Sequence, residues 1–334
     1  MKVAILDDYQ NVALQLADWS AVQRRAEITV FNDHLGEATA VIERLRPFDA
    51  VCVMRERTPL TKDILEQLPR LKLIASTGPR NASIDMRTAA DLGIVVTATG
   101  YESTPTIEFT WSLILASVRH LYQEAASVRR GGWQITLGAN LRGKYLGVIG
   151  LGNIGKEVAR IGLAFGTHVI AWSQNLTKET AAAVGATLVD KETLFRESDI
   201  VTIHLVLSQR TAGLVGATEL RMMKQTARLI NTSRGPIVNQ ADLIDALEAR
   251  TIAGAAIDVF DLEPLPLTTP IERWTTCSRL RISATLPRNS IEHSSAMRLL
   301  ASPRGSRGKR CPLNSETSDY SLATPYGSRA RTGE

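Results

Sequence analysis

Short apolar runs alternate with amphipathic stretches from residue 1 to about residue 258. The apolar runs are rich in β-branched residues and read as strands at 2–6, 28–31, 50–54, 71–75 and 94–97, then at 146–149, 167–172, 200–204, 227–231 and 252–258. Between them, stretches such as Ala38–Leu45 and Lys62–Leu68 have helical spacing, and one long helical segment over 104–126 separates the two series. This alternation predicts an α/β protein with two doubly wound parallel-sheet domains, each covered by helices on both faces.

The last 61 residues differ in composition from this body. Residues 274–334 hold ten Lys/Arg and four Asp/Glu, a local charge of +6, which leaves −1 for residues 1–273 out of the total of +5. Eleven Ser and the lack of sustained periodicity are typical of a segment that does not pack as a domain. Nucleic-acid binding needs a basic face on a folded domain, so binding through this tail is the least favoured functional hypothesis.

Targeting and metal signals are missing from the sequence. The start, MKVAILDDYQ, is too short and too acidic for a signal peptide, and no stretch approaches the ~18–20 apolar residues of a membrane span. Cys52, Cys277 and Cys311 are scattered and odd in number, which indicates neither a disulfide framework nor a metal site. We therefore expect a cytoplasmic protein with no membrane, nucleic-acid or metal partner.

Three glycines constrain the second domain most closely. Gly150, Gly152 and Gly155 form G-x-G-x-x-G directly after a strand and at the start of a helix expected over Asn153–Ala164. Glycines there permit a tight turn and let backbone N–H groups approach a pyrophosphate at the helix N-terminus. Alone, the pattern also fits a packing turn, but the strand at 167–172 completes the βαβ unit that a dinucleotide site requires. We therefore expect a Rossmann-type NAD(P)-binding domain over 102–273.

The residues after that strand leave the phosphate state of the cofactor open. Discrimination normally rests there on an acid that binds the ribose 2′-hydroxyl, or on an Arg that accepts a 2′-phosphate. The chain reads Trp172-Ser-Gln-Asn175, with Lys178 as the nearest cation. The prediction is NAD or NADP, with a slight preference for NAD.

Two further strands end in residues suited to acid chemistry. Arg234, in Leu229-Ile-Asn-Thr-Ser-Arg-Gly235, could hold a planar carboxylate bidentately, or it could be an ordinary surface Arg. Glu263, in Asp258-Val-Phe-Asp-Leu-Glu-Pro264, could orient a His and hold it protonated, or it could lie in a solvated acidic loop. Neither motif decides between these alternatives alone.

Taken in order, GLGNIG, HLVLS, NTSRG and DVFDLEPLP resemble the D-isomer-specific 2-hydroxyacid dehydrogenases, which include phosphoglycerate, glyoxylate/hydroxypyruvate and formate dehydrogenases. Ser76–Asp85 looks like the substrate loop of that family and Thr106–Thr110 like the start of its interdomain helix, so the resemblance covers residue 1 to about 273. It implies a flavodoxin-like substrate domain over 1–101, an interdomain helix at 104–126, a homodimer, and hydride transfer between nicotinamide and a small 2-hydroxy or 2-oxo acid.

The resemblance also assigns roles position by position. Arg234 would bind the substrate carboxylate, Glu263 would pair with the catalytic His, and the backbone at Gly78 and Pro79 would help to hold the substrate. Asn153 and Ile154 would lie under the pyrophosphate and Ser173 at the adenosine ribose, while Asp258 would reach toward the carboxamide. The whole cofactor set is Gly150, Gly152, Asn153, Ile154, Gly155, Ser173, His204, Val206, Thr232, Ser233 and Asp258.

The proton donor is where the chain departs from the family. That donor is a His in a Pro-His-(Ile/Leu)-Gly stretch some twenty residues after the Glu, and residues 271–285 contain no His. His293 is the only later candidate, and its surroundings, Ile291-Glu-His-Ser, do not match the motif.

A change of reading frame offers one explanation. Read in threes from the third base of the Trp274 codon, the permitted codons include Asp-Asn-Val-Leu-Ala-Thr-Pro-His-Ile-Gly-Tyr-Val, and the His codon straddles those of Arg281 and Ile282. The alternative is a real, divergent extension. In that case the chain would be an impaired relative that binds a nucleotide without catalysis, such as a sensor or a corepressor-like protein.

Overall fold

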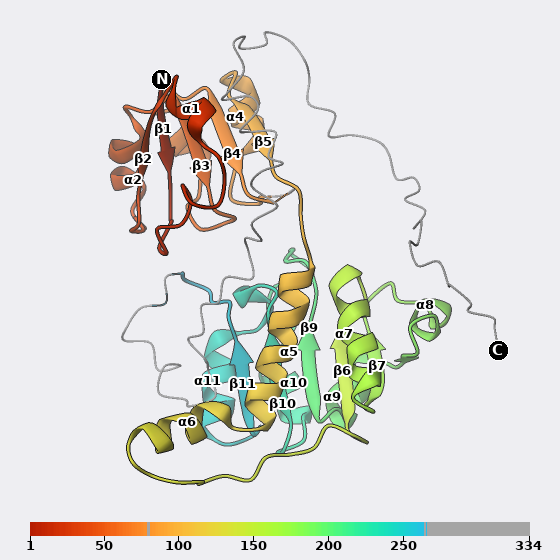
Figure 1. Cartoon of the computed structure of the whole chain (residues 1–334). Coiled ribbons are helices and arrows are strands. Elements are labelled where there is room, and N and C mark those ends of the chain that lie inside the picture. The colour runs from red at the N-terminus through yellow and green to blue at the C-terminus, as the bar shows by residue number, and fades with distance from the viewer. Residues whose placement is uncertain (79–80, 264, 266–334) are drawn as a thin grey trace, which may run out of the picture.

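The computed structural model of the chain describes residues 1–78, 81–263 and 265. They form two parallel sheets, one in each half of the chain (Figure 1). Every strand pair in both sheets is parallel. The predicted α/β class with two doubly wound parallel sheets is confirmed. The catalytic motif expected after residue 265 lies outside the described residues.

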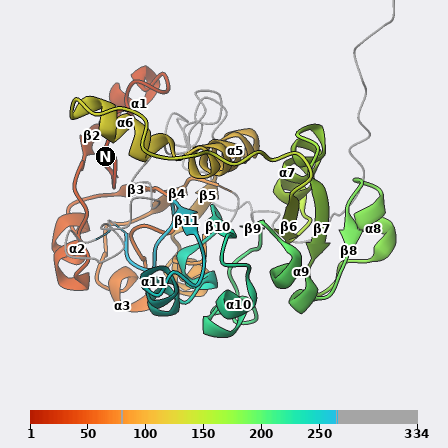
Figure 2. The same cartoon turned by 90° about the horizontal axis from the view of Figure 1, so that it is seen from below.

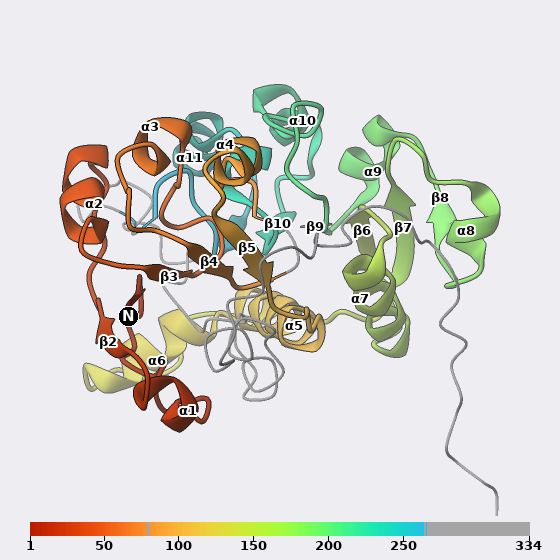
Figure 3. The same ribbon diagram turned by 90° about the horizontal axis from the view of Figure 1, so that it is seen from above.

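The first sheet has the strand order β2-β1-β3-β4-β5. Its strands are β1 (Lys2–Ile5), β2 (Glu27–Val30), β3 (Ala50–Val53), β4 (Leu73–Ser76) and β5 (Val95–Ala98). Helices α2 (Ala38–Leu45), α3 (Lys62–Leu65) and α4 (Met86–Asp91) cover one face, and the short α1 (Ser20–Gln23) lies on the other (Figure 3). This order is the flavodoxin-like variant of the doubly wound fold.

The second sheet has the strand order β11-β10-β9-β6-β7-β8. Its strands are β6 (Tyr145–Ile149), β7 (His168–Trp172), β8 (Thr187–Leu188), β9 (Ile200–Ile203), β10 (Arg228–Asn231) and β11 (Gly254–Ile257). Renumbered within the domain, this order is that of the Rossmann fold. Strands β9 and β10 are buried at every residue, as expected for central parallel strands covered on both faces.

Helices cover both faces of this sheet (Figure 2). One face carries α5 (Thr104–Val118) and α7 (Asn153–Ala164), and the other carries α9 (Lys191–Glu197), α10 (Ala217–Met222) and α11 (Gln240–Glu248). A short α8 (Lys178–Ala182) precedes β8, and a 3-10 turn, η1 (Gly235–Ile237), follows β10.

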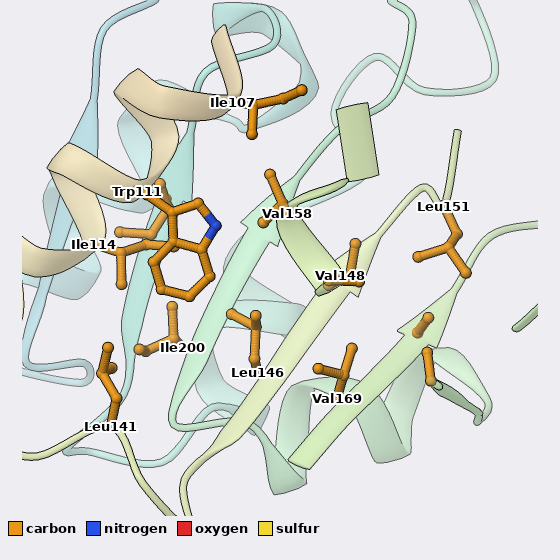
Figure 4. Packing of buried hydrophobic residues seen from close by; sticks show 14 of the residues in the cluster. Ile107, Trp111, Ile114, Leu141, Leu146, Val148, Leu151, Val158, Val169 and Ile200 are labelled. Atoms are coloured by element: carbon orange, nitrogen blue, oxygen red, sulfur yellow. The ribbon is translucent and has the colours of Figure 1, made fainter. Parts of the chain in front are cut away.

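The predicted interdomain helix packs on the second sheet. Ile107, Trp111 and Ile114 of α5 lie in one buried cluster with Leu146 of β6 and Val158 of α7 (Figure 4). The buried positions of α7 recur at Gly155, Val158, Ala159 and Gly162, so a single apolar stripe faces the sheet. Helix α5 thus follows the last strand of the first domain in the chain and packs into the core of the second domain.

One local prediction was wrong: the segment 104–126 is two helices. Helix α5 ends at Val118, and α6 (Leu121–Arg129) begins after His120, whose backbone is left-handed with φ 53°. A left-handed non-glycine residue cannot continue an α-helix, and a contact holds it here. Arg228 Nη2 donates to His120 Nε2 at 3.2 Å. The cause is therefore tertiary, from a residue 108 positions away.

Strand order also predicts where ligands bind. In an open α/β sheet the crevice lies beyond the carboxyl ends of the strands, where the order reverses. That point falls between β6 and β9 in the second sheet, and between β1 and β3 in the first. The carboxyl ends of the two sheets face one another in Figure 1. None of the helices described is long and apolar enough to cross a membrane.

Candidate active site

The glycine turn lies at the switch point of the second sheet. Gly150 has φ 94°, and a Cβ there would lie 2.6 Å from the carbonyl oxygen of His204, at the end of neighbouring β9. A Cβ on Gly155 would lie 2.0 Å from the carbonyl oxygen of Gly150. At Gly152, the N-cap of α7, a Cβ would meet nothing within 4 Å. The first and third glycines are thus required by packing, while the second faces open space in front of a helix N-terminus.

That open space fits a pyrophosphate. The backbone N–H groups of Asn153 and Ile154 belong to the first turn of α7, where they have no partner within the helix and carry the positive end of its dipole. An anion held there needs no side-chain cation. The residues present therefore fit the cofactor that the sequence implies.

A cavity of about 530 Å³ opens beside the end of β7. It is lined by Trp172, Ser173, Gln174, Leu176, Leu188, Val189, Asp190 and Thr193. Ser173, which is predicted to meet the adenosine ribose, is one of the residues that line this cavity. Asp190 accepts hydrogen bonds from the backbone N–H and hydroxyl of Thr193, which hold its pKa below the ordinary value. The cavity therefore carries a carboxylate, and none of its lining residues is a cation.

His204 and Val206 follow β9 with different roles. The His204 ring is partly buried, its Nε2 lies 2.9 Å from the Thr202 hydroxyl, its enclosed Nδ1 has no partner among the described residues, and desolvation lowers its pKa to about 3. Desolvation therefore favours the neutral form of this imidazole at physiological pH. Val206 is 76% exposed and offers an apolar surface next to the glycine turn.

Thr232 and Ser233 are held by internal hydrogen bonds. The Thr232 hydroxyl lies 2.8 Å from that of Thr110 on α5, and the Ser233 hydroxyl donates to the carbonyl oxygen of Ile203 at 2.7 Å. Asn231 fixes the same turn, because its side chain donates to the Arg234 carbonyl and accepts from the Ser233 N–H. These bonds fix the turn from which the Arg234 side chain extends.

Asp258 follows β11, and the charges of Glu263 and Arg234 both act on its carboxyl. Burial, reinforced by the nearby charge of Glu263, raises the pKa of Asp258 to about 7, and Arg234 acts in the opposite direction. Asp258 Oδ1 is buried and has no hydrogen-bond partner among the described residues. Glu263 Oε1 accepts from the Phe260 N–H at 3.1 Å. An unpartnered buried carboxyl beside a positive Arg is a polar group prepared for a ligand.

Arg234 joins the two domains. Its Nη2 donates to both oxygens of Glu56, at 2.9 and 3.2 Å, and its Nη1 donates to the Ser233 carbonyl. Glu56 follows β3, at the switch point of the first sheet. The guanidinium thus pairs with a carboxylate of the other domain, while its binding of a substrate carboxylate stays a prediction.

The substrate loop of the first domain is described only in part. Gly78 has φ 85°, and its N–H donates to the Thr99 hydroxyl at 2.7 Å, while Pro79 lies outside the described residues. Arg55, on the loop with Glu56, packs beside Gly78 and lies over the ring of Tyr101. Within the described part of the chain, no three His, Cys, Asp or Glu side chains gather as a metal site.

Comparison with known proteins gives the family. Residues 111–283 match the model described as D-isomer specific 2-hydroxyacid dehydrogenase, NAD binding domain. The chain belongs to this family. A glyoxylate reductase of Aeropyrum pernix is 45% identical over 213 residues, which are 61% of this chain and 64% of that protein. A glyoxylate reductase of Thermococcus litoralis is 36% identical over 73% of this chain and 76% of its own.

A solved structure agrees with this membership. The phosphoglycerate oxidoreductase of Vibrio cholerae O395 superposes with a TM-score of 0.83 and 35% identity, covering 89% of this chain and 97% of its own. The predictions of the family, the fold and an oxidoreductase are confirmed. These relatives are named as enzymes, so they give no support to the hypothesis of a sensor or corepressor.

The sequence interpretation missed Glu56 and its neighbour Arg55. A signal was present, because Arg55-Glu56-Arg57 is a run of charges directly after a buried strand. Charged residues at the carboxyl end of a parallel strand are candidates for ligand contact. The run did not reveal its partner, since Arg234 lies 178 residues further along the chain.

Proposed function

We propose that the chain transfers a hydride between NAD and a small 2-hydroxy or 2-oxo acid, with glyoxylate as the first substrate to test. The observation that carries this proposal is the pairing of Arg234 with a carboxylate, close to Asp258, at the same edge of the sheet as the glycine turn. A site that holds a carboxylate next to a dinucleotide suits a 2-oxo acid. The names of the two glyoxylate reductases support this choice.

Each residue has a task in this scheme. Nicotinamide supplies the hydride when it is bound. Arg234 orients the acid through its carboxylate, and Asp258 offers a hydrogen bond at the nicotinamide side. Glu263 is the partner for a protonated His donor, and its role rests on the family pattern alone. The proposed division is a substrate domain over 1–101 and an NAD-binding domain over 102–273.

The cavity beside β7 supports NAD over NADP. A 2′-phosphate placed near Ser173 would meet the ionised Asp190 and no cation among the lining residues. We expect NADH to bind about tenfold more tightly than NADPH, a difference of ~1.4 kcal/mol. The variant Asp190→Asn should bring the NADH and NADPH affinities closer together, because it removes the negative charge that repels the 2′-phosphate. Equal affinities in the unmodified chain would contradict the preference.

A second copy of the chain is the proposed partner. Apolar side chains project from α6 and the segment after it, with Val128 55%, Trp133 76%, Ile135 61% and Leu137 94% exposed. Exposed apolar side chains that follow one another along α6 and the next segment fit burial against a second copy of the chain. Light scattering should give a dimer, and Leu137→Asp should shift it toward monomer. A cytoplasmic location remains a prediction.

The catalytic test concerns the proton donor. The coding DNA across codons 268–312 should be sequenced from the source, and two proteins compared: the chain as written and a version with Pro-His-Ile-Gly restored. Both should bind NADH, while glyoxylate reduction should be ~10²–10⁴-fold slower in the written chain, because general acid catalysis contributes about that much. If neither protein reduces glyoxylate, hydroxypyruvate or pyruvate, the proposed reaction is wrong.

A further inference from the structure

Glu56 occupies the position that a substrate carboxylate needs. Its two oxygens accept from Arg234 Nη2, the only hydrogen bonds of this carboxylate within the part of the chain that the structure describes. Arg234 Nη1 is engaged by the Ser233 carbonyl. The Arg234 guanidinium therefore faces the first domain, and the Glu56 carboxylate occupies the nitrogen that the Ser233 carbonyl leaves free.

The backbone of the Glu56 loop is fixed on both sides. The Arg55 N–H donates to the Thr77 hydroxyl at 2.9 Å, and Arg57 Nη1 donates to the Asp7 carbonyl at 3.0 Å. Thr58 donates to the Asp7 carboxylate at 2.7 Å. Because the flanking residues are tied to β1 and β4, the Glu56 side chain can move by rotamer change without moving its loop.

A second cation stands near Glu56. Burial lowers the pKa of Arg55, the charge of Arg234 lowers it further, and the charge of Glu56 raises it. Arg55 and Arg234 thus both act on the same carboxylate. A Glu56 displaced from Arg234 would stay near the positive charge of Arg55, and its side chain is already 29% exposed.

We propose that Glu56 is an internal competitor for the substrate carboxylate: it neutralises Arg234 in the free protein and must leave before a 2-oxo acid binds. This inference rests on the proposed function. It makes Glu56 a residue that sets substrate affinity, since every carboxylate ligand must displace it. Because the Arg234 and Glu56 side chains are 38% and 29% exposed, the pair is of the weak, solvent-screened kind that a ligand can break.

The test measures binding of oxamate, an unreactive carboxylate, to the full chain saturated with NADH. The variant Glu56→Gln keeps the size of the side chain and removes its charge. We expect oxamate to bind about two- to fivefold more tightly to this variant, in line with the small cost of an exposed ion pair. NADH affinity should not change, because Glu56 lies on the first domain. Titration calorimetry reports both constants without turnover.

A matched control removes an equivalent charge elsewhere in the same domain. Glu66 pairs with Lys62 on the exposed side of α3, so Glu66→Gln should leave the oxamate constant unchanged. Equal oxamate affinity in wild type and Glu56→Gln, or weaker affinity in the variant, would overturn the inference and leave the proposed function intact. Weaker binding would mean that Glu56 orients Arg234. If oxamate binds none of the proteins in the presence of NADH, the proposed function itself fails.

Discussion

The two sheets reverse their strand order in the same way, yet the two switch points are built differently. In the second sheet the chain beside β6 and β9 is packed so tightly that a Cβ at Gly150 or Gly155 would strike backbone, while a Cβ at Gly152 would meet nothing within 4 Å. In the first sheet the space between β1 and β3 is filled by Asp7, whose carboxylate accepts from Thr58 and lies 2.8 Å from His34 Nδ1. The second switch point leaves open space at Gly152, where we propose that the cofactor pyrophosphate binds, whereas the first is a buried polar cluster that holds loops in place.

This difference separates cofactor binding from scaffold stability. Removing a glycine should change what the second switch point can accept. Removing Asp7 should loosen the first domain without touching the nucleotide. Substitutions at the two places can therefore test whether the roles are distinct.

The largest effect is expected at the glycine turn. Gly155→Ala places a methyl group 2.0 Å from the Gly150 carbonyl oxygen, so the turn must shift. We expect a loss of stability of about 1–3 kcal/mol from overpacking and a loss of NADH affinity of ~100-fold or more. Urea unfolding and NADH fluorescence titration measure the two quantities.

Gly152→Ala is the matched variant. Its methyl group would meet nothing within 4 Å in the protein, so the fold should keep its stability to within ~0.5 kcal/mol. The same methyl group enters the space assigned to the pyrophosphate, and NADH affinity should still fall by about tenfold or more. Unchanged NADH affinity in Gly152→Ala would place the pyrophosphate elsewhere.

A smaller effect, on stability alone, is expected at the first switch point. Asp7→Ala removes a carboxylate that is 1% exposed and leaves Thr58 and His34 without their acceptor. We expect a loss of ~2–4 kcal/mol in the unfolding of the first domain. Asp7→Asn should lose less, because Asn tolerates the left-handed backbone at φ 59°. NADH affinity should stay within twofold of wild type.

The control for Asp7 is a surface acid in the same domain. Asp33 pairs with Arg44 at a position where its side chain is 59% exposed. Asp33→Asn should therefore cost less than ~1 kcal/mol. If Asp7→Ala and Asp33→Asn destabilise the first domain equally, the buried cluster is not what holds the Glu56 loop.

The two switch points also differ in how much of each could be predicted from the sequence. The glycine turn, α7 and the flanking strands were predictable, because their signals are local: β-branched apolar runs, a helical period of 3.6 and glycines at fixed spacing. Helix α2 falls at Ala38–Leu45 and α7 at Asn153–Ala164, as predicted. Arg234 and Asp258 were placed on one sheet edge for the same reason.

Long-range contacts were not predictable from such signals. The end of α5 depends on Arg228 reaching His120, and the partner of Arg234 is a Glu on the other domain. The Asp7 cluster joins residues from three separate loops. Each of these is set by tertiary packing, which overrides helix propensity at His120 and leaves no periodic trace at Glu56.

The smallest expected effect is a pH dependence that compares two partly buried groups, His204 and Asp258, at the carboxyl edge of the second sheet. Asp258 has its pKa raised from 3.8 to about 7, so the folded state binds the extra proton, and stability falls as pH rises through about 7. His204 has its pKa lowered from 6.5 to about 3, so the unfolded state binds the extra proton, and stability falls as pH drops below 6.5. Between pH 3.8 and 6.5 the two contributions oppose each other.

Asp258→Asn should therefore expose the His204 contribution. In this variant the free energy of unfolding should rise with pH up to about 6.5 more steeply than in wild type, by at most ~1.4 kcal/mol per pH unit. Adding His204→Gln should remove the extra slope, which identifies its source. Urea unfolding at half-unit intervals from pH 4.5 to 7.5 measures both profiles. Parallel profiles for wild type and Asp258→Asn would mean that Asp258 is ionised in the folded protein, and it would then meet the carboxamide as a charged acceptor only.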